Sequence, residues 1–394
     1  MSERLADPDG APSEALVTLY DVWSKGGAGL LVTGNVMVDR RAIGEPGNVV
    51  VEGERHRAEM SAWAAAARSG GAVAWAQINH PGRQAPRTVN REAVAPSAVP
   101  MAGAQAFAFA KPRALSSPEI EEIVERFGRA AQALVGAGFD GVQIHGAHGY
   151  LINQFLSPRT NRRDDAWGGD ADRRARFLLE VVRAVRAAVG SSVPVGVKLN
   201  SADFQRGGFT EDESMRVVSA LEAAGVDLLE VSGGTYESAA MFAEPSKSTR
   251  EREAFFLAYA ERVRQTTSMP ILLTGGFRSR AGMDAALASG AIDVVGLARP
   301  LAAEPDLAAR LLDGRATHAA TFALATGQKT IDSAIQAGWY QTQIRRVANG
   351  EAPSFSLGRL GALYRYVVPH PVRPSATNSR VGGRLPNTRQ AIRS

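Results

Sequence analysis

Short apolar segments alternate along this chain with longer stretches in which apolar residues recur at helical spacing. The apolar segments predict seven buried strands, at residues 28–33, 73–78, 139–144, 193–199, 227–231, 271–274 and 293–297. The stretches between them predict helices at 118–137, 171–189, 210–224, 251–267 and 279–289, and another helix at about 12–25 precedes the first strand. Such alternation, with strands that are apolar throughout, is typical of a parallel sheet covered by helices.

Boundary residues support several of these helices. Ser117, followed by Pro118 and Glu119, predicts an N-cap at Ser117. Thr210 and Glu213 predict a capping box, in which each side chain bonds the backbone N–H of the other residue. Helices often end at a glycine in the left-handed region, and glycines follow four of the predicted helices: Gly138, Gly190, Gly225 and Gly290.

The number and order of the strands favour a barrel. Strand–helix units over about 290 residues are more typical of a (β/α)8 TIM barrel than of an open doubly wound sheet. No strand is followed by the GxGxxG of a dinucleotide-binding fold. A barrel of this type needs eight strands, and this chain shows seven behind an initial helix. We therefore predict an α/β TIM-barrel domain at residues 1–315 that lacks its first β-strand at the N-terminus.

Residues 316–394 carry no strand alternation. We predict a C-terminal helical and irregular extension here, with a helix at 331–348 and a loosely structured end, SATNSRVGGRLPNTRQAIRS. An appended segment of this kind either packs on the barrel or makes contacts in a homo-oligomer.

Composition excludes several classes of site. The 394 residues include no cysteine, which excludes disulfides, thiolate zinc sites, cysteine-ligated clusters and a cysteine nucleophile. No apolar run reaches the roughly 20 residues that span a bilayer, and the N-terminus has no apolar signal core. We expect a cytoplasmic protein that does not act at a membrane. The net charge of +5 is spread along the chain without an aromatic-interleaved basic patch, which favours phosphorylated ligands over nucleic acid.

The densest group of proton-carrying side chains lies just after the strand at 139–144. His145, His148 and Tyr150 stand within six positions of a chain that has only six histidines. Residues after a barrel strand face its C-terminal mouth, and two imidazoles there can donate to one carbonyl oxygen. A structural histidine pair and a metal site are the alternatives, although no carboxylate or thiolate stands nearby at ligand spacing. Tyr150 suits protonation of a carbon atom, or it packs as an aromatic side chain.

Six motifs, in order, carry a resemblance to a known family. They are LLVTG at 30–34, QINHPGR at 77–83, the stretch at 145–169, VKL at 197–199, TGG at 274–276 and GLARP at 296–300. From about residue 11 to 312 the chain resembles the Old Yellow Enzyme family, FMN-dependent ene-reductases of the NADH:flavin oxidoreductase group. The combination of QxxHxGR with HGAHGY and NQFLSPxxNxRxDxxGG makes the resemblance highly specific.

The resemblance implies non-covalently bound FMN, NAD(P)H as co-substrate and an activated C=C bond in a small-molecule substrate. It implies that His145 and His148 hold the oxygen of an α,β-unsaturated carbonyl and that Tyr150 donates the proton. Gln77 and Lys198 would bond the polar edge of the isoalloxazine ring. Many relatives carry arginine at the second of these positions, so Lys198 keeps the charge but loses bidentate geometry.

Further FMN contacts are implied at the other strand ends. Gly34 ends a strand, where the absence of a side chain lets a planar ring approach the backbone. Barrels commonly bind phosphate at the loops after their last two strands. The matching residues there are Gly275, Gly276, Ala298 and Arg299.

Two loops near the expected site are interpreted separately. Residues 159–168 read as scaffolding held by ion pairs. The loop at 233–248 reads as a lid or substrate wall, with Tyr236, Met241 and Phe242 as candidate lining residues.

The predicted function is ping-pong hydride transfer from NAD(P)H through FMN to the β-carbon of an enone-type substrate, with no metal. The absent first strand supports an alternative, because losing one strand opens two sheet edges. A truly truncated chain would be a catalytically impaired family member that acts as a binding protein. A start codon placed too late would explain the same absence with the enzyme intact.

Overall fold

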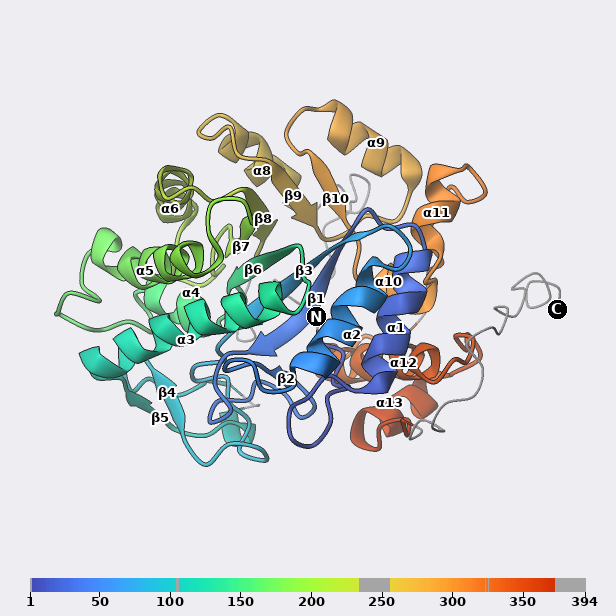
Figure 1. Ribbon diagram of the computed structural model, residues 1–394, viewed down its shortest axis with the longest axis horizontal. Coiled ribbons are helices and arrows are strands. Elements are labelled where there is room, and N and C mark those ends of the chain that lie inside the picture. The colour runs from blue at the N-terminus through green and yellow to red at the C-terminus, as the bar shows by residue number, and fades with distance from the viewer. Residues whose placement is uncertain (1, 104–105, 234–255, 323, 325, 373–394) are drawn as a thin grey trace.

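The computed structural model describes residues 2–103, 106–233, 256–322, 324 and 326–372. Its centre is one sheet of eight parallel strands in the order β10-β9-β8-β7-β6-β3-β1-β2. The sheet curls, and helices lie along its outer side (Figure 1). The α/β barrel architecture expected from the sequence is therefore confirmed.

Seven of the strands coincide with the seven predicted apolar segments. The strands are β1 (Leu30–Met37), β2 (Val49–Val50), β3 (Val73–Asn79), β6 (Gly141–Gly146), β7 (Val195–Asn200), β8 (Leu228–Ser232), β9 (Ile271–Thr274) and β10 (Val294–Gly296). The two-residue β2 was not predicted, and it pairs with the end of β1. A separate small sheet contains β4 (Ala93–Ala95) and β5 (Pro112–Ala114), with the 3-10 helix η1 (Ala106–Ala108) between them in the chain.

The sheet is open between β1 and β10. In the described part of the chain these two strands do not pair with each other, and no further strand joins them. The segment that precedes the first helix lies against β1. There the carboxylate of Glu3 accepts hydrogen bonds from the N–H of Gly34, at 2.7 Å, and from the hydroxyl of Tyr20. Glu3 thus satisfies a backbone N–H of β1 that is not bonded to another strand.

The predicted helices are present, and several helices were not predicted. They are α1 (Glu14–Lys25), α2 (Arg57–Arg68), α3 (Ser117–Gly136), α4 (Leu151–Leu156), α5 (Ala171–Val189), α6 (Glu211–Ala223), α8 (Leu257–Arg264), α9 (Arg280–Ala288), α10 (Arg299–Ala303), α11 (Leu307–Leu312), α12 (Lys329–Ala348) and α13 (Arg359–Val367). The helix predicted at 251–267 corresponds to α8, and residues 251–255 lie outside the described part of the chain.

Capping explains where two of the barrel helices begin. The N-cap of α3 is Ser116, one residue before the predicted Ser117. That position puts Glu119 at N3, where its carboxylate accepts from the Ser116 N–H at 2.8 Å. The capping box of α6 is confirmed, because Thr210 and Glu213 bond each other's backbone N–H groups.

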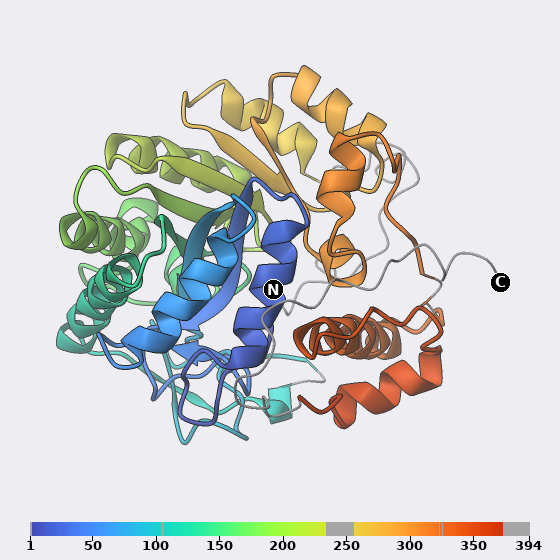
Figure 2. The same ribbon diagram turned by 45° about the vertical axis from the view of Figure 1, so that its right-hand side comes forward.

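The C-terminal extension packs on the barrel. α12 lies against α13 on one side and against α1 and α10 on the other, as both views show (Figures 1 and 2). Gln341 on α12 donates to the carbonyl of Ser2 at 2.7 Å, and Arg345 donates to the carbonyl of Arg4 at 3.0 Å. The extension therefore holds the segment that contacts β1. The division of the chain into domains at residue 315 stays a prediction.

Two apolar regions stabilise the barrel. The larger lies between sheet and helices, where Trp63, Phe127 and Phe177 are fully buried, each contributing about 2 kcal/mol by burial. The smaller is a plug inside the barrel, built on Trp75, Leu228 and Leu272. Within the described residues, no helix combines the length and apolar character needed to cross a membrane.

Candidate active site

Two polar layers lie in the barrel interior beyond the apolar plug. Because side chains alternate along a strand, residues two and four positions after Trp75 and Leu228 also point inward. Side-chain contacts connect Gln77, Gln143, Lys198 and Glu230 into the layer next to the plug. The layer nearer the strand ends contains the residues two positions further along the same four strands, Asn79, His145, Asn200 and Ser232. All eight residues are buried. The fold therefore gathers the predicted Gln77, His145 and Lys198 from three strands.

The layer next to the plug is a connected charged network. The Nζ of Lys198 lies 2.9 Å from a carboxylate oxygen of Glu230. Gln143 donates to the other oxygen of Glu230 at 2.8 Å and accepts from Gln77 at 2.6 Å. Burial opposes the charge on Glu230, but Lys198 and the hydrogen bonds of Gln143 and Thr274 outweigh it and lower the pKa of that carboxyl. Lys198 is therefore a buried ion-pair residue.

The two histidines and the tyrosine come together at the end of β6. The imidazole ring centres of His145 and His148 lie 5.0 Å apart, and the rings of His145 and Tyr150 meet edge to face at 4.9 Å. His145 and Tyr150 are buried, whereas His148 is partly exposed. The three side chains thus form one cluster, as their spacing in the sequence led us to expect.

Both imidazoles are neutral in this setting. Burial lowers the pKa of His145 well below 6.5, and the neighbouring His148 and Lys198 add to the effect. Burial and the charge of Lys198 also lower the pKa of His148. The N–H of Ala147 donates to Nδ1 of His145, so the ring proton of a neutral His145 is on Nε2, where it can be donated. Nε2 of His148 lies 2.7 Å from the hydroxyl of Ser232.

The turn that carries His148 is held from several elements. His148 adopts a left-handed backbone conformation with φ of 61°, which is uncommon for residues other than glycine. Its N–H donates to the side chain of Asn200, and its carbonyl accepts from Gln84. The next N–H, that of Gly149, donates to Asn153 at 2.7 Å. These amide side chains offset the cost of the turn and set the direction of the His148 ring.

The residues expected near a phosphate lie together at the ends of the last two strands. β9 and β10 pair through Thr274 and Gly296, which brings the following residues Gly275 and Gly276 close to Ala298 and Arg299. Both glycines have positive φ, at 132° and 93°. Arg299 is exposed and donates to Gln336 of α12 at 2.9 Å.

Comparisons with known proteins agree with this arrangement. The model of the NADH:flavin oxidoreductase / NADH oxidase family matches residues 1–318. The chain belongs to this family. It is 40% identical over 328 residues to an NADH-dependent flavin oxidoreductase of Hypocrea jecorina, covering 77% of this chain and 82% of that protein. It is 37% identical to an NADH oxidase of Thermoanaerobacter brockii, covering 80% of this chain and 48% of that protein.

Solved structures show the same fold. A 2-naphthoyl-CoA reductase in complex with 2-naphthoyl-CoA matches with a TM-score of 0.74 and 28% identity, over 80% of this chain and 49% of that chain. The old yellow enzyme homologue from Zymomonas mobilis matches with a TM-score of 0.69 and 24% identity, over 82% and 89% of the two chains. As a member of the NADH:flavin oxidoreductase family, the chain is an NAD(P)H-dependent enzyme that uses FMN. Membership favours this enzyme over the alternative of a degenerate binding protein.

The interior of this family member fits FMN. The amide oxygen of Gln77 is buried and has no hydrogen-bond partner in the structure, so it can accept a bond from the ring. Lys198 supplies a buried positive charge in the same layer. The sequence led us to expect that a planar ring approaches the backbone at Gly34. In the structure, the carboxylate of Glu3 occupies the space beside the Cα of Gly34.

Six polar residues of this oxidoreductase site were missed in the sequence. They are Asn35, Asn79, Gln143, Asn200, Glu230 and Ser232. A signal was available for Glu230, because a charged residue inside the apolar strand DLLEV needs a buried partner. No comparable signal marked Asn35, whose orientation depends on strand pairing. The loop proposed as a lid, with Tyr236, Met241 and Phe242, lies outside the described residues.

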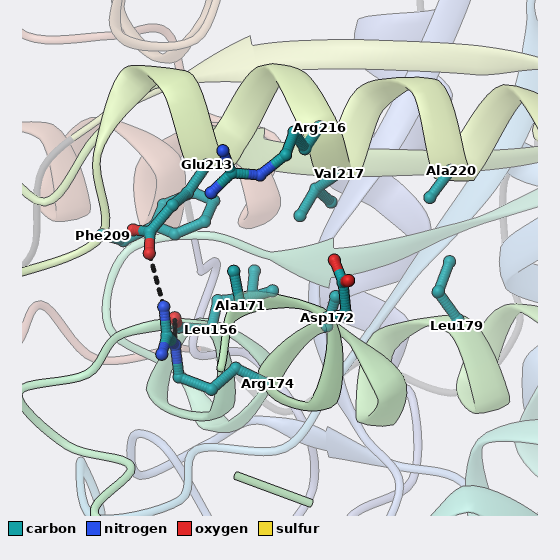
Figure 3. A pocket seen from close by; sticks show the side chains of 11 residues that line it. Leu156, Ala171, Asp172, Arg174, Leu179, Phe209, Glu213, Arg216, Val217 and Ala220 are labelled. Atoms are coloured by element: carbon teal, nitrogen blue, oxygen red, sulfur yellow. Dashed lines mark hydrogen bonds and ion pairs between the residues drawn. The ribbon is translucent and has the colours of Figure 1, made fainter. Parts of the chain in front are cut away.

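The surface of the barrel carries a groove. The groove runs between α5 and α6 on the outside of the barrel, and an ion pair between Arg174 and Glu213 crosses it (Figure 3). In the loop at 159–168, Arg163 pairs with Asp165 and donates to the carbonyl of Leu115. The scaffolding role of this loop stays a prediction. None of the predicted site residues lines the groove.

Proposed function

We propose that this oxidoreductase is an ene-reductase that uses NADH to reduce the C=C bond of α,β-unsaturated carbonyl compounds. The observation that carries the proposal is the cluster of two neutral imidazoles and a phenol at the end of β6. NADH is proposed ahead of NADPH because several relatives are named for it. The substrate class also agrees with a matched structure that contains 2-naphthoyl-CoA, a conjugated thioester.

Each residue of the cluster has a proposed task. Nε2–H of His145 donates to the carbonyl oxygen of the substrate, together with a ring N–H of His148. A neutral imidazole suits this task, because its N–H group stabilises the developing negative charge on the oxygen by a hydrogen bond. Tyr150 delivers a proton to the α-carbon, for which a weak acid is suited. FMN, when bound, accepts hydride from NADH and passes it to the β-carbon in a ping-pong cycle.

The FMN contacts are part of the proposal. Gln77 and Lys198 would hold the ring from the charged layer, and Gly34, which lies in the middle of β1 and not at its end, would contribute its backbone. Gly275, Gly276, Ala298 and Arg299, at the ends of β9 and β10, would hold the phosphate. The cation of Lys198 would stabilise negative charge on the reduced ring.

Tyr150→Phe separates the proposed half-reactions. The variant loses the phenol proton but keeps the ring that packs on His145, so we expect reduction by NADH to proceed at the wild-type rate. Reoxidation by 2-cyclohexenone should slow by roughly 100-fold, the usual contribution of a general acid. Stopped-flow absorbance of the flavin measures both steps in the purified FMN-loaded protein.

A matched control is Tyr259→Phe. Tyr259 is also a buried tyrosine, but its hydroxyl bonds Ser214 at 2.7 Å beneath α6, so both half-reactions should keep their rates. Equal rates of enone reduction in Tyr150→Phe and wild type would overturn the assigned role of Tyr150. A protein that does not bind FMN would overturn the proposed function itself.

A further inference from the structure

A bulge interrupts the pairing of β1 with β3. Val32 pairs with Trp75 and Asn35 pairs with Gln77, so β1 has one residue more than β3 between these two pairs. The hydroxyl of Thr33 fills the interruption by accepting from the backbone N–H of Gln77 at 2.9 Å. Bulges change the direction in which the following side chains point.

The bulge turns Asn35 into the barrel. Before it, Leu30 and Val32 belong to the interior plug, while Leu31 faces the outer core. Strict alternation would continue inward at Val36, yet Val36 lies in the outer core. The extra residue therefore exchanges the two faces, and Asn35 takes the inward position.

Asn35 contacts Tyr150 directly. Its side-chain amide donates to the Tyr150 hydroxyl oxygen at 3.1 Å. Asn35 is 6% exposed and Tyr150 is 4% exposed, so little water competes for this bond. The contact joins β1 to the turn after β6, residues that are 115 positions apart.

A donor held against a phenol oxygen affects its two protonation states unequally. The hydrogen bond is stronger to the phenolate than to the phenol, because the acceptor then carries a full charge. In a buried site with a low local dielectric this difference grows. The donated bond also occupies one lone pair of the phenol oxygen, so the phenol proton points away from Asn35.

We propose that Asn35 is a positioning residue for proton transfer, which stabilises the phenolate left on Tyr150 and directs the phenol proton away from β1. The inference rests on the proposed role of Tyr150 as proton donor. The hydrogen bond from Asn35 explains how the buried Tyr150 can release its proton during substrate reduction. Asn35 itself acts only through Tyr150.

The test measures the pKa of Tyr150 in Asn35→Leu and Asn35→Asp. Leucine has a similar size without a donor, and we expect the pKa of Tyr150 to rise by about one unit, since a hydrogen bond to a charged group is lost. Aspartate adds a negative charge beside the phenolate and should raise the pKa further. NMR of protein with tyrosine isotopically labelled at Cζ follows the ionisation, and Tyr150→Phe identifies the resonance.

The kinetic consequence is specific to one half-reaction. Reoxidation by 2-cyclohexenone should slow by roughly tenfold in Asn35→Leu, in proportion to the lost stabilisation of the phenolate. Reduction by NADH should be unchanged. Asn90→Leu is the matched control, because Asn90 is a buried asparagine that bonds the backbone of Ile43 on another loop. It should leave the pKa of Tyr150 as in wild type.

The outcomes separate this inference from the proposed function. An unchanged or lowered pKa of Tyr150 in Asn35→Leu contradicts the inference, whatever the activity. If Asn35→Leu does not fold, the smaller Asn35→Ala decides by the same measurement, because it also removes the donor without adding a charge. Full activity in Tyr150→Phe contradicts the proposed role of Tyr150, while the pKa measurement still decides whether Asn35 stabilises its phenolate.

Discussion

Among single residues, Lys198 has the most constrained setting. It is buried with Glu230, which accepts from Lys198 and from Gln143 on neighbouring strands. A buried ion pair costs desolvation on both sides, and such a pair is strongly destabilised when one partner is removed. Glu230 therefore holds the Nζ of Lys198 in place by an ion pair of 2.9 Å.

Removing the charge of Lys198 and removing the charge of Glu230 should shift the flavin midpoint potential in opposite directions. Lys198→Met removes the cation that stabilises the reduced ring, so the potential should fall. Glu230→Gln leaves that cation without its counter-charge, so the potential should rise, while the free energy of unfolding falls by about 3 kcal/mol. Spectroelectrochemical titration of the FMN-loaded variants measures the potential.

Lys198→Arg is the control for charge alone. Because it keeps a cation at the same position, its potential should stay closer to wild type than that of Lys198→Met. A shift of the same sign in Lys198→Met and Glu230→Gln would contradict the proposed placement of the pair beside the ring.

Among the elements, α5 has a role beyond covering the sheet. Arg174 in its first turn donates to the carbonyls of Leu156 and Gly169 and pairs with Glu213 of α6 (Figure 3). One side chain thus joins the end of α4, Gly169 just before α5, and α6. Because the guanidinium is buried, these bonds are made with little competition from water.

Arg174→Met should lower the free energy of unfolding by about 3 kcal/mol, since it removes the buried guanidinium and leaves the partly buried carboxylate of Glu213 without its cationic partner. Urea denaturation followed by circular dichroism measures the change. The control is Arg183→Met on the same helix, an arginine whose side chain is 62% exposed and pairs with Glu180. It should change stability by less than about 0.5 kcal/mol. Equal losses in both variants would show that Arg174 does not organise these elements.

At the scale of the whole molecule, the buried His80 and His145 and the partly buried His148 make stability depend on pH. Burial lowers the pKa of His80 to about 4, and it also lowers those of His145 and His148. In the unfolded chain each histidine takes up a proton near pH ~6.5. Between these values the unfolded state binds more protons than the folded state, so stability falls as pH falls.

Lowering the pH from about 7.5 to 5 should therefore destabilise the protein by about 2 kcal/mol for His80 alone, and His145 and His148 should add losses of the same sign. Denaturant unfolding at a series of pH values measures this. His80→Gln removes one contribution, so its stability should fall less steeply over the same range. A variant with the wild-type slope would contradict the assignment of a neutral, buried His80.

The strand–helix order was predictable because it depends on local properties. Apolar runs such as 271–274 and the capping box at Thr210 identify elements within a few residues of their ends. The N-cap at Ser116 was misplaced by one residue because two serines offer the same chemistry. The helix α13 was missed because apolar residues such as Leu360 are exposed, so its apolar positions do not mark one buried side of the helix.

The sequence by itself determined the order of the barrel units, the family and the cluster of His145, His148 and Tyr150, because these depend on residues that are close in the chain. Only the tertiary structure decided which partners complete the cluster. The bulge in β1 turns Asn35 toward Tyr150. Pairing across β6, β7 and β8 brings Glu230 to Lys198. Such contacts depend on the register of the paired strands, and the order of residues along the chain does not specify that register.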